Sequence, residues 1–354
     1  MGNDTNNPTE FDEANAWKAH VTPIQITTAL TFTIGCVHFA CGIFRLKFIS
    51  TYLSDALIKG LTTGAAVHVM VSQIDDILGI EIGRISGIGM ILFKMIEIVK
   101  KISFVNYVTL GASVITYGFL YVGETYINPL MEKLFKKKIP IPYEMIVMLA
   151  FTVVSSIVGF EDKFKVEVVG EVPSGIPVPE VPVFQIVPDL ITNAVSIAMV
   201  IMALHLSMTK MLADMLKYEV DAGQELYAIS FTSVLSSFFP VYPNSIALGR
   251  TFVLVNSGGK TMMTNLFSSI LMLLVIFFIG PLLYSLPMCI LSSIIAFALR
   301  PMFRNLLLLP DIYKVSKYDA SIFGVAFLGT LATDIVTGFL MSVGFALFTG
   351  KNPL

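Results

Sequence analysis

Charge is scarce in this chain of 354 residues. Lys, Arg, Asp and Glu make up 14% of the sequence, whereas a soluble globular protein carries about 25%. The net charge is −2, so the chain lacks the basic field that attracts nucleic acid, and no nucleic-acid partner is predicted. Cysteine is scarce too. Cys36, Cys41 and Cys289 all lie in apolar segments, and their odd number argues against a disulfide framework.

The sequence also lacks the residue sets of enzymes and cofactor proteins. It contains no Ser-His-Asp, Cys-His or zinc-spaced set, so we predict no enzyme, no cofactor and no metal site. The run SGGKT at residues 257–261 is similar to the end of a phosphate-binding loop. Leu254 stands where such a loop needs its first glycine, which excludes a nucleotide site.

Several polar residues in apolar surroundings favour a structural interpretation over a functional one. Asp75 and Asp76 are paired at the end of an expected helix, where we predict a solvated loop face rather than a cation site. Gln224 and Glu225 are expected to form a polar cluster at a helix start. Three histidines share no spacing, so each is predicted to be a satisfied core side chain: His38, His68 and His205.

Long uncharged runs are what the chain has in abundance, and 55% of its residues are hydrophobic. Residues 21–44, 102–123 and 190–209 carry no Asp, Glu, Lys or Arg, and each run meets the requirement of about 20 residues for a membrane helix. With shorter apolar elements included, the sequence predicts roughly eleven membrane elements. Residues 1–20 form a polar tail without the features of a signal peptide.

Three segments depart from a simple span. Residues 84–101 alternate apolar and charged positions at helical spacing, which predicts a helix lying at the membrane interface. Residues 162–188 are polar and rich in proline, which predicts an extended loop. Residues 320–350 are too long for one helix, and we expect two short helices with Asp334 capping the second.

Lys and Arg gather in alternate loops, while the loops between them carry acids or little charge. This alternation predicts a cytosolic C-terminus and an extracytosolic loop at residues 162–188. An odd number of crossings then leaves the N-terminus outside. Because no targeting segment precedes it, we expect that upstream sequence is missing.

Residues 238–260 indicate a membrane helix that is interrupted. Pro240 and Pro243 break an uncharged stretch, the chain restarts at Asn244, and a lone Arg250 follows. Irregular backbone at membrane depth is tolerated only where protein or a water-filled cavity covers it. A half-helix that starts there directs free N–H groups and the positive end of its dipole into that cavity, so an anion is the expected ligand.

Several segments, in order, resemble the sulfate permease (SulP) family, whose animal members are multifunctional anion exchangers. The resemblance covers about residues 25–350. It rests on YLSDALIKGLTTGAAVHVMVSQIDDILGI at 52–80, VGEVPSGIPVPEVP at 169–182, YEVDAGQEL at 218–226, FFPVYPNSIALGRT at 238–251 and SGGKT at 257–261.

The resemblance implies an all-α integral membrane protein with two inverted repeats of seven helices, the 7+7 transporter fold. Segments one to four and eight to eleven would form a mobile core and the others a gate. Segments three and ten would be half-helices that meet at the substrate. Residues 21–182 resemble segments four to seven, and residues 183–350 resemble segments eight to fourteen. We therefore expect a partial fold in which the first three helices and the C-terminal STAS domain are missing.

The resemblance places the substrate site on the interrupted helix. Arg250 matches the arginine that ends the family motif and would hold positive potential beside the anion, while Ser245 matches a family serine and could donate a hydrogen bond or cap the half-helix. The family often has Ser-Gly-Ser-Leu-Ser-Arg where this chain has Ser-Ile-Ala-Leu-Gly-Arg, which puts anion selectivity in doubt. The predicted substrate-binding residues are Asn244, Ser245, Ala247, Leu248, Gly249 and Arg250.

Two functions follow as expectations. The first is a secondary active anion transporter or exchanger of the plasma membrane, for sulfate, chloride, bicarbonate or oxalate. It would lie in the lipid bilayer and could form a homo- or hetero-dimer. The alternative is a truncated, non-transporting isoform or fragment that acts as a partner or regulator of full-length transporters. The expected absence of the half-helix facing Asn244 favours the alternative, and the motifs favour the first.

Overall fold

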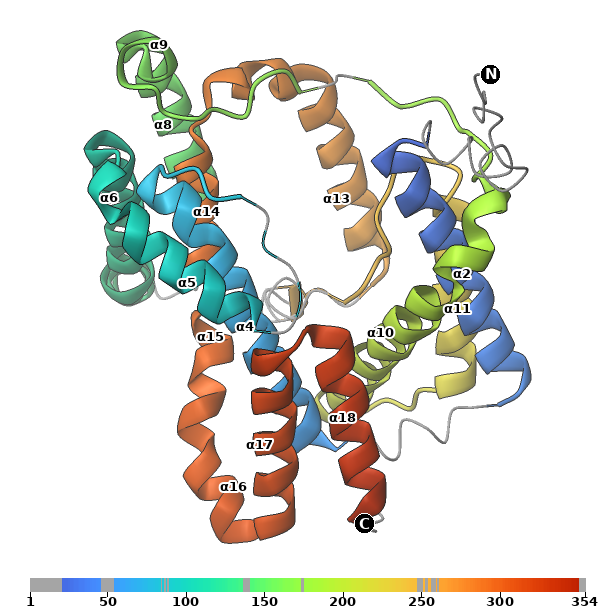
Figure 1. The fold of residues 1–354 in the computed structure, drawn as a ribbon. Helices are drawn as coiled ribbons and strands as arrows, with labels where there is room; N and C mark the ends of the chain where they lie inside the picture. The colour runs from blue at the N-terminus through green and yellow to red at the C-terminus, as the bar shows by residue number, and fades with distance from the viewer. Residues whose placement is uncertain are drawn as a thin grey trace, which may run out of the picture. The chain divides into compact units, whose positions relative to one another are not determined.

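The computed structural model describes residues 21–45, 54–83, 85, 87, 89–135, 141–172, 175–246, 251, 254–255, 259 and 261–349 (Figure 1). Within these ranges the regular structure is helical, apart from an isolated antiparallel bridge between Val168 and Pro287. The chain divides into two compact units, Met1–Thr51 with Pro177–Ile246 and Tyr52–Ile176 with Ala247–Leu354. Each unit therefore combines segments from both predicted repeats.

The helices of the first unit are α2 (Pro23–Ile43), η5 (Phe184–Ile186), α10 (Val187–Leu216) and α11 (Ala222–Ser236). The helices of the second unit are α4 (Asp55–Leu78), α5 (Met90–Lys101), η3 (Ile102–Phe104), α6 (Tyr107–Val122), η4 (Gly123–Ile127), α7 (Asn128–Phe135), α8 (Tyr143–Val158), α9 (Phe160–Phe164), α13 (Met263–Leu274), η6 (Val275–Ile279), η7 (Gly280–Ser285), α14 (Met288–Ala298), α15 (Arg300–Phe303), η8 (Arg304–Leu308), α16 (Leu309–Val315), α17 (Lys317–Ala332) and α18 (Ile335–Phe348).

Helix α2 packs against both α10 and α11 in the first unit. It begins with a capping box, in which the Thr22 hydroxyl accepts from the Gln25 N–H and the Gln25 side chain accepts from the Thr22 N–H. Gly35 faces α11 so closely that an added Cβ would lie 2.8 Å from Val234 Cγ2. A small residue such as this glycine lets membrane helices approach closely. Close packing matters in lipid because burial of apolar surface does not drive helices together there.

Helices α4, α17 and α18 form the tightest packing of the second unit. A Cβ added at Gly60 would lie 2.5 Å from the Phe323 carbonyl oxygen, and one at Gly338 would lie 2.4 Å from Thr330 Oγ1. As predicted, the chain breaks between α17 and α18, and Asp334 is the N-cap of α18. Its Oδ1 atom accepts from the N–H groups of Val336 and Thr337, each at 2.9 Å.

Helix α14 packs against α4 and α6 in the same unit. The preceding stretch, residues 284–288, pairs with residues 167–170 through backbone hydrogen bonds. Among them, the N–H of Met288 donates to the Glu167 carbonyl at 2.9 Å. At the other end of α14 the Arg300 guanidinium lies 3.7 Å from the centre of the Phe297 ring and pairs with Glu124 on η4.

The helix predicted over residues 84–101 begins later than expected, and its place at the membrane interface stays a prediction. Helix α5 begins only at Met90. Two of its three lysines bind the protein: Lys94 Nζ donates to both carboxylate oxygens of Asp75, at 3.0 and 2.9 Å, and Lys101 Nζ donates to the Glu81 carbonyl at 2.7 Å. The exposed residues are mostly apolar, namely Leu92, Phe93, Met95, Ile96 and Val99, and Lys100 is exposed with them.

Within the part of the chain that the structure describes, three helical stretches are long and apolar enough to cross a membrane: Pro23–Ile43, Phe184–Ala213 and Met288–Val315. A fourth span results if Met90–Phe104 and Tyr107–Leu134, which meet at a bend of 115°, are taken together. Shorter apolar helices occupy Tyr143–Val158, Met263–Ile279 and Ile335–Phe348. The described structure thus contains both full-length and short apolar elements, while the predicted total of about eleven stays a prediction.

Candidate functional site: the interrupted helix and its surroundings

The interruption predicted near Pro240 and Pro243 is present. Helix α11 ends at Ser236, residues 241–246 are not helical, and helical backbone returns at Thr251, Leu254 and Val255. The N–H of Gly259 then donates to the Leu254 carbonyl at 3.0 Å. Proline causes the break because it has no N–H to donate and disfavours helical backbone in the residue before it.

Two hydrogen bonds within the first unit hold the non-helical stretch in place. Ser233 Oγ on α11 donates to Asn244 Oδ1 at 3.0 Å, and the N–H of Glu180 donates to the Phe238 carbonyl at 2.7 Å. Ser233 is only 1% exposed, so its hydroxyl is a rigid anchor. The start of the predicted half-helix is therefore fixed to α11 through Asn244.

The predicted substrate-binding residues are only partly described. Asn244 and Ser245 are exposed. The side-chain oxygen Oδ1 of Asn244 accepts a hydrogen bond from Ser233, so the Asn244 side chain positions the non-helical stretch. Ala247, Leu248, Gly249 and Arg250 lie outside the described residues, and the boundary between the two compact units follows Ile246. The anion site as a whole stays a prediction. The anchoring Ser233 was not predicted, because it is one of several serines in an apolar helix.

A histidine–carboxylate pair joins α10 to α11 in the first unit. His205 Nε2 lies 2.8 Å from Glu225 Oε2, and both side chains are partly buried. Glu225 is in the first turn of α11, whose N-cap is Asp221, so the helix dipole favours its negative charge. The polar cluster at this helix start was predicted, whereas its partner on α10 was not.

His38 and His68 are buried core side chains; the prediction that they are satisfied is confirmed at Nε2 of both rings, whereas His38 Nδ1 is buried and has no hydrogen-bond partner among the described residues. His38 Nε2 lies 2.9 Å from the Ala198 carbonyl oxygen, and His68 Nε2 lies 2.7 Å from the Thr330 carbonyl oxygen. A carbonyl can only accept, so Nε2 carries the proton in both rings. Among the residues that the structure describes, no group of three or more His, Cys, Asp and Glu side chains could hold a metal ion.

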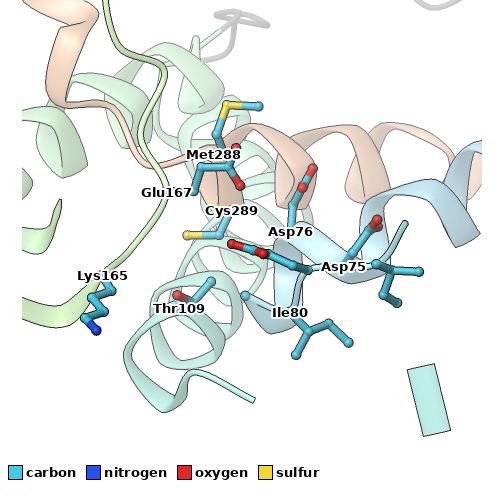
Figure 2. Close-up of a pocket in the computed structure, with 11 residues that line it drawn as sticks. Asp75, Asp76, Ile80, Thr109, Lys165, Glu167, Met288 and Cys289 are labelled. Atoms are coloured by element: carbon cyan, nitrogen blue, oxygen red, sulfur yellow. The ribbon is translucent and has the colours of Figure 1, made fainter. Parts of the chain in front are cut away.

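An acidic pocket in the second unit corrects the prediction for Asp75 and Asp76 (Figure 2). The two side chains do not form a solvated loop face. They belong to the last turn of α4 and are partly buried. Asp75 is held by Lys94 and Asp76 Oδ2 accepts from Ser292 Oγ at 2.6 Å. Sequence spacing could not show this, because Ser292 is more than two hundred positions away.

Comparisons with known proteins converge on a single family. The profile of the Sulfate permease family matches residues 8–326. The chain is 34% identical over 352 residues to Sulfate permease family protein 3 of Caenorhabditis elegans, an alignment that covers 99% of this chain and 45% of that protein. It is 34% identical over 328 residues to Prestin of Danio rerio, with 92% and 44% covered, and 31% identical over 325 residues to Sulfate transporter of Homo sapiens, also with 92% and 44% covered.

Solved structures agree. The structure titled "The overall structure of SLC26A9" matches with a TM-score of 0.87 at 28% identity, covering 95% of this chain and 52% of that one. The murine Slc26a9 anion transporter in the inward-facing state matches with a TM-score of 0.85 at 27% identity, covering 99% and 55%. The transmembrane domain of the cyanobacterial bicarbonate transporter BicA shares the fold, with a TM-score of 0.69 at 20% identity. The chain thus spans about half the length of the curated relatives and of the two SLC26A9 structures, and 76% of the BicA domain.

Proposed function

Since the chain belongs to the sulfate permease family, we propose that it contributes the anion-binding half-helix of a secondary active anion transporter or exchanger in the plasma membrane. The observation that carries the proposal is the interrupted helix: α11, a non-helical stretch at residues 241–246, and helical backbone again from Thr251. A helix that restarts after open backbone offers unpaired N–H groups to a ligand.

The surroundings of the break favour an anion. From Leu226 to Gly249 the chain carries no charged side chain, and Arg250 is the first charge after it. The backbone N–H groups of Ala247, Leu248 and Gly249, with the Ser245 hydroxyl, would bind the anion, and Arg250 would hold positive potential beside it. Asn244 would position these donors through its bond to Ser233.

The expected affinity is weak. The dipole of a partly buried helix end is worth at most about 2 kcal/mol, and each charge-assisted hydrogen bond roughly 1.5–3 kcal/mol. Two such bonds and the dipole give at most about 8 kcal/mol before the cost of removing the anion from water is subtracted. If removing the anion from water costs about 4 kcal/mol, about 4 kcal/mol is left, which corresponds to a dissociation constant of about 1 mM. Such an affinity suits a transporter, which must release its substrate.

Tracer uptake of sulfate and chloride tests this proposal. The test uses the full-length protein. In it, Arg250→Gln removes the positive charge beside the predicted anion site and keeps the backbone N–H donors. We expect its uptake to fall about tenfold or more, or its apparent KM to rise by that factor, at equal surface expression. The control is Arg304→Gln, the same change at an exposed residue of η8. Equal rates and equal KM for wild type and Arg250→Gln would refute an anion site at Arg250.

A second candidate is association with a full-length relative instead of transport. It is favoured by α13, where every residue is exposed except the partly exposed Thr264. Co-purification of this chain with a separately tagged full-length copy, reduced by replacing Leu266 and Phe267 with serine, would support it. Anion uptake by the chain expressed alone in liposomes would exclude it as the sole function.

A further inference from the structure

The histidine–carboxylate pair between α10 and α11 combines a titratable side chain with a negative charge. His205 Nε2 lies 2.8 Å from Glu225 Oε2, and the two side chains are 21% and 33% exposed. Histidine is the side chain whose charge ordinarily changes between about pH 5 and pH 8. Because both side chains keep some exposed surface, protons from the solvent can reach the pair.

Three helices fix the position of the pair within the first unit. The residues that follow His205 and Glu225 in the chain, Leu206 and Leu226, are buried and pack in one cluster with Cys41 of α2. This cluster sets the places at which α10 and α11 present their polar side chains. The contact is therefore part of the packing of the unit, unlike a meeting of two mobile side chains on a surface.

The chemistry of the two groups determines where a proton binds. An ionised carboxylate can only accept a hydrogen bond, so Nε2 of the neutral His205 ring carries the hydrogen in this contact and a further proton binds Nδ1. That proton adds the attraction between imidazolium and carboxylate to a hydrogen bond that is already present. It also changes the net charge of the pair from −1 to 0.

A second imidazole lies near the pair but is closed to solvent. On the elements packed against α10 the titratable side chains are Cys36, His38 and Cys41 on α2, and Glu225 and Tyr227 on α11, while η5 carries none. Charges on His38 and His205 would repel each other. His38 is only 1% exposed and its Nε2 atom contacts the Ala198 carbonyl. Further along the chain Lys210 belongs to α10, and Asp221 is the N-cap of α11. Of the two imidazoles, His205 is thus the one that solvent protons reach.

The pair belongs to the helix that holds the start of the predicted anion site. From Glu225 to Ser233 the axis of α11 rises by about 12 Å, and Ser233 binds Asn244. At an effective dielectric constant of about 20, one unit charge about 12 Å away changes the affinity for a monovalent anion by at most about tenfold. A pair of charge −1 would therefore weaken anion binding relative to a neutral pair.

We propose that His205 and Glu225 form a proton-binding site that makes anion uptake by this protein depend on pH. The inference rests on the proposed anion transport. Protonation of His205 cancels the charge of Glu225 and so favours an anion at the start of the half-helix. By linkage, a bound anion favours protonation of the pair by the same factor. At anion concentrations below KM, uptake should therefore be faster at about pH 6 than at about pH 8.

Tracer chloride uptake by the full-length protein at these two pH values tests the proposal, because chloride itself does not titrate between them. The wild type should take up chloride severalfold faster at the lower pH, and at most about tenfold faster. His205→Gln keeps the negative charge of the pair at both pH values, so its uptake should stay at the slow rate that the wild type has at the higher pH. His205→Lys keeps the pair neutral at both, so its uptake should stay at the fast rate.

The matched control for uptake is His20→Gln, the same change in the polar tail. It should keep the pH dependence of the wild type. The proposal is overturned if wild-type uptake is equal at the two pH values, or if both His205 variants keep the wild-type pH dependence.

A double-mutant cycle tests the proton site without transport. Thermal unfolding midpoints are measured in detergent for the wild type, His205→Gln, Glu225→Gln and the double variant, at about pH 5.5 and about pH 8.5. The coupling between the two side chains should be larger at the lower pH, where the contact is an ion pair. Equal coupling at both pH values would mean a structural contact only and would overturn the proposal. Coupling that depends on pH would support the proton site even if the uptake of Arg250→Gln refuted the anion site.

Discussion

At the scale of single residues, glycine decides how closely the second unit packs. Gly338 and Gly344 both belong to α18, but only Gly338 touches another helix: its Cβ would lie within 2.5 Å of the Thr330 backbone, whereas nothing lies within 4 Å of one at Gly344. Backbone cannot move aside as a flexible side chain can. The same substitution at the two sites should therefore have opposite effects.

We predict that Gly338→Ala lowers the free energy of unfolding by about 1–3 kcal/mol, as overpacked cores do. Gly344→Ala should leave it unchanged or raise it by up to about 1 kcal/mol, because alanine favours helix over glycine. The measurement is the thermal unfolding midpoint of each variant in detergent. Equal midpoints for the two variants would contradict the close approach of α17 and α18.

At the scale of elements, one carboxylate organises the turn between α17 and α18. Asp334 accepts from two N–H groups through Oδ1, and its Oδ2 accepts from the Thr337 hydroxyl at 2.8 Å. Asp334→Ala should cost about 0.5–2 kcal/mol of stability, as the loss of an N-cap does. Asp334→Asn keeps a capping oxygen and should recover most of that loss. Denaturation of the three proteins compares them, and an Asn variant as unstable as the Ala variant would show that charge, not capping, matters.

Helix α5 depends on a different interaction, the pair of Lys94 with Asp75. Their side chains are 16% and 20% exposed, so each charge is costly without the other. We predict that Lys94→Met destabilises the protein by roughly 1–3 kcal/mol, and that Lys94→Met with Asp75→Asn loses less than the sum of the two single changes. A double-mutant cycle measures this coupling. Strict additivity would mean that the pair does not hold α5 in solution.

At the scale of the whole molecule, the basic loops predict the orientation in the membrane. We expect a tag after Leu354 to be cytosolic and residues 162–188 to be extracytosolic. Val178 is 77% exposed, so Val178→Cys should react with a membrane-impermeant maleimide in intact cells above the wild-type background. The tag should bind antibody only after permeabilisation. A tag that intact cells expose, together with an unlabelled Val178→Cys, would reverse the orientation.

The sequence by itself determined the membrane class, the family and the two breaks in helical structure. These features depend on composition or on neighbours in the chain: scarce charge indicates hydrocarbon surroundings, Pro240 and Pro243 interrupt the helix after α11, and Asp334 caps α18 through groups two and three residues away. The anion site was predicted at Asn244 and the residues after it. The structure describes only the first two residues of that site, Asn244 and Ser245. It confirms that the helix is broken there.

The tertiary structure alone decided which polar groups meet. It paired Asp75 with Lys94, Asp76 with Ser292 and His205 with Glu225. The physical reason is that a helix has several faces, and the periodicity of one segment does not say which distant helix covers each face. In lipid an apolar face can point outward, so polarity alone does not tell inside from outside. The acidic pocket exists only because these faces are brought together.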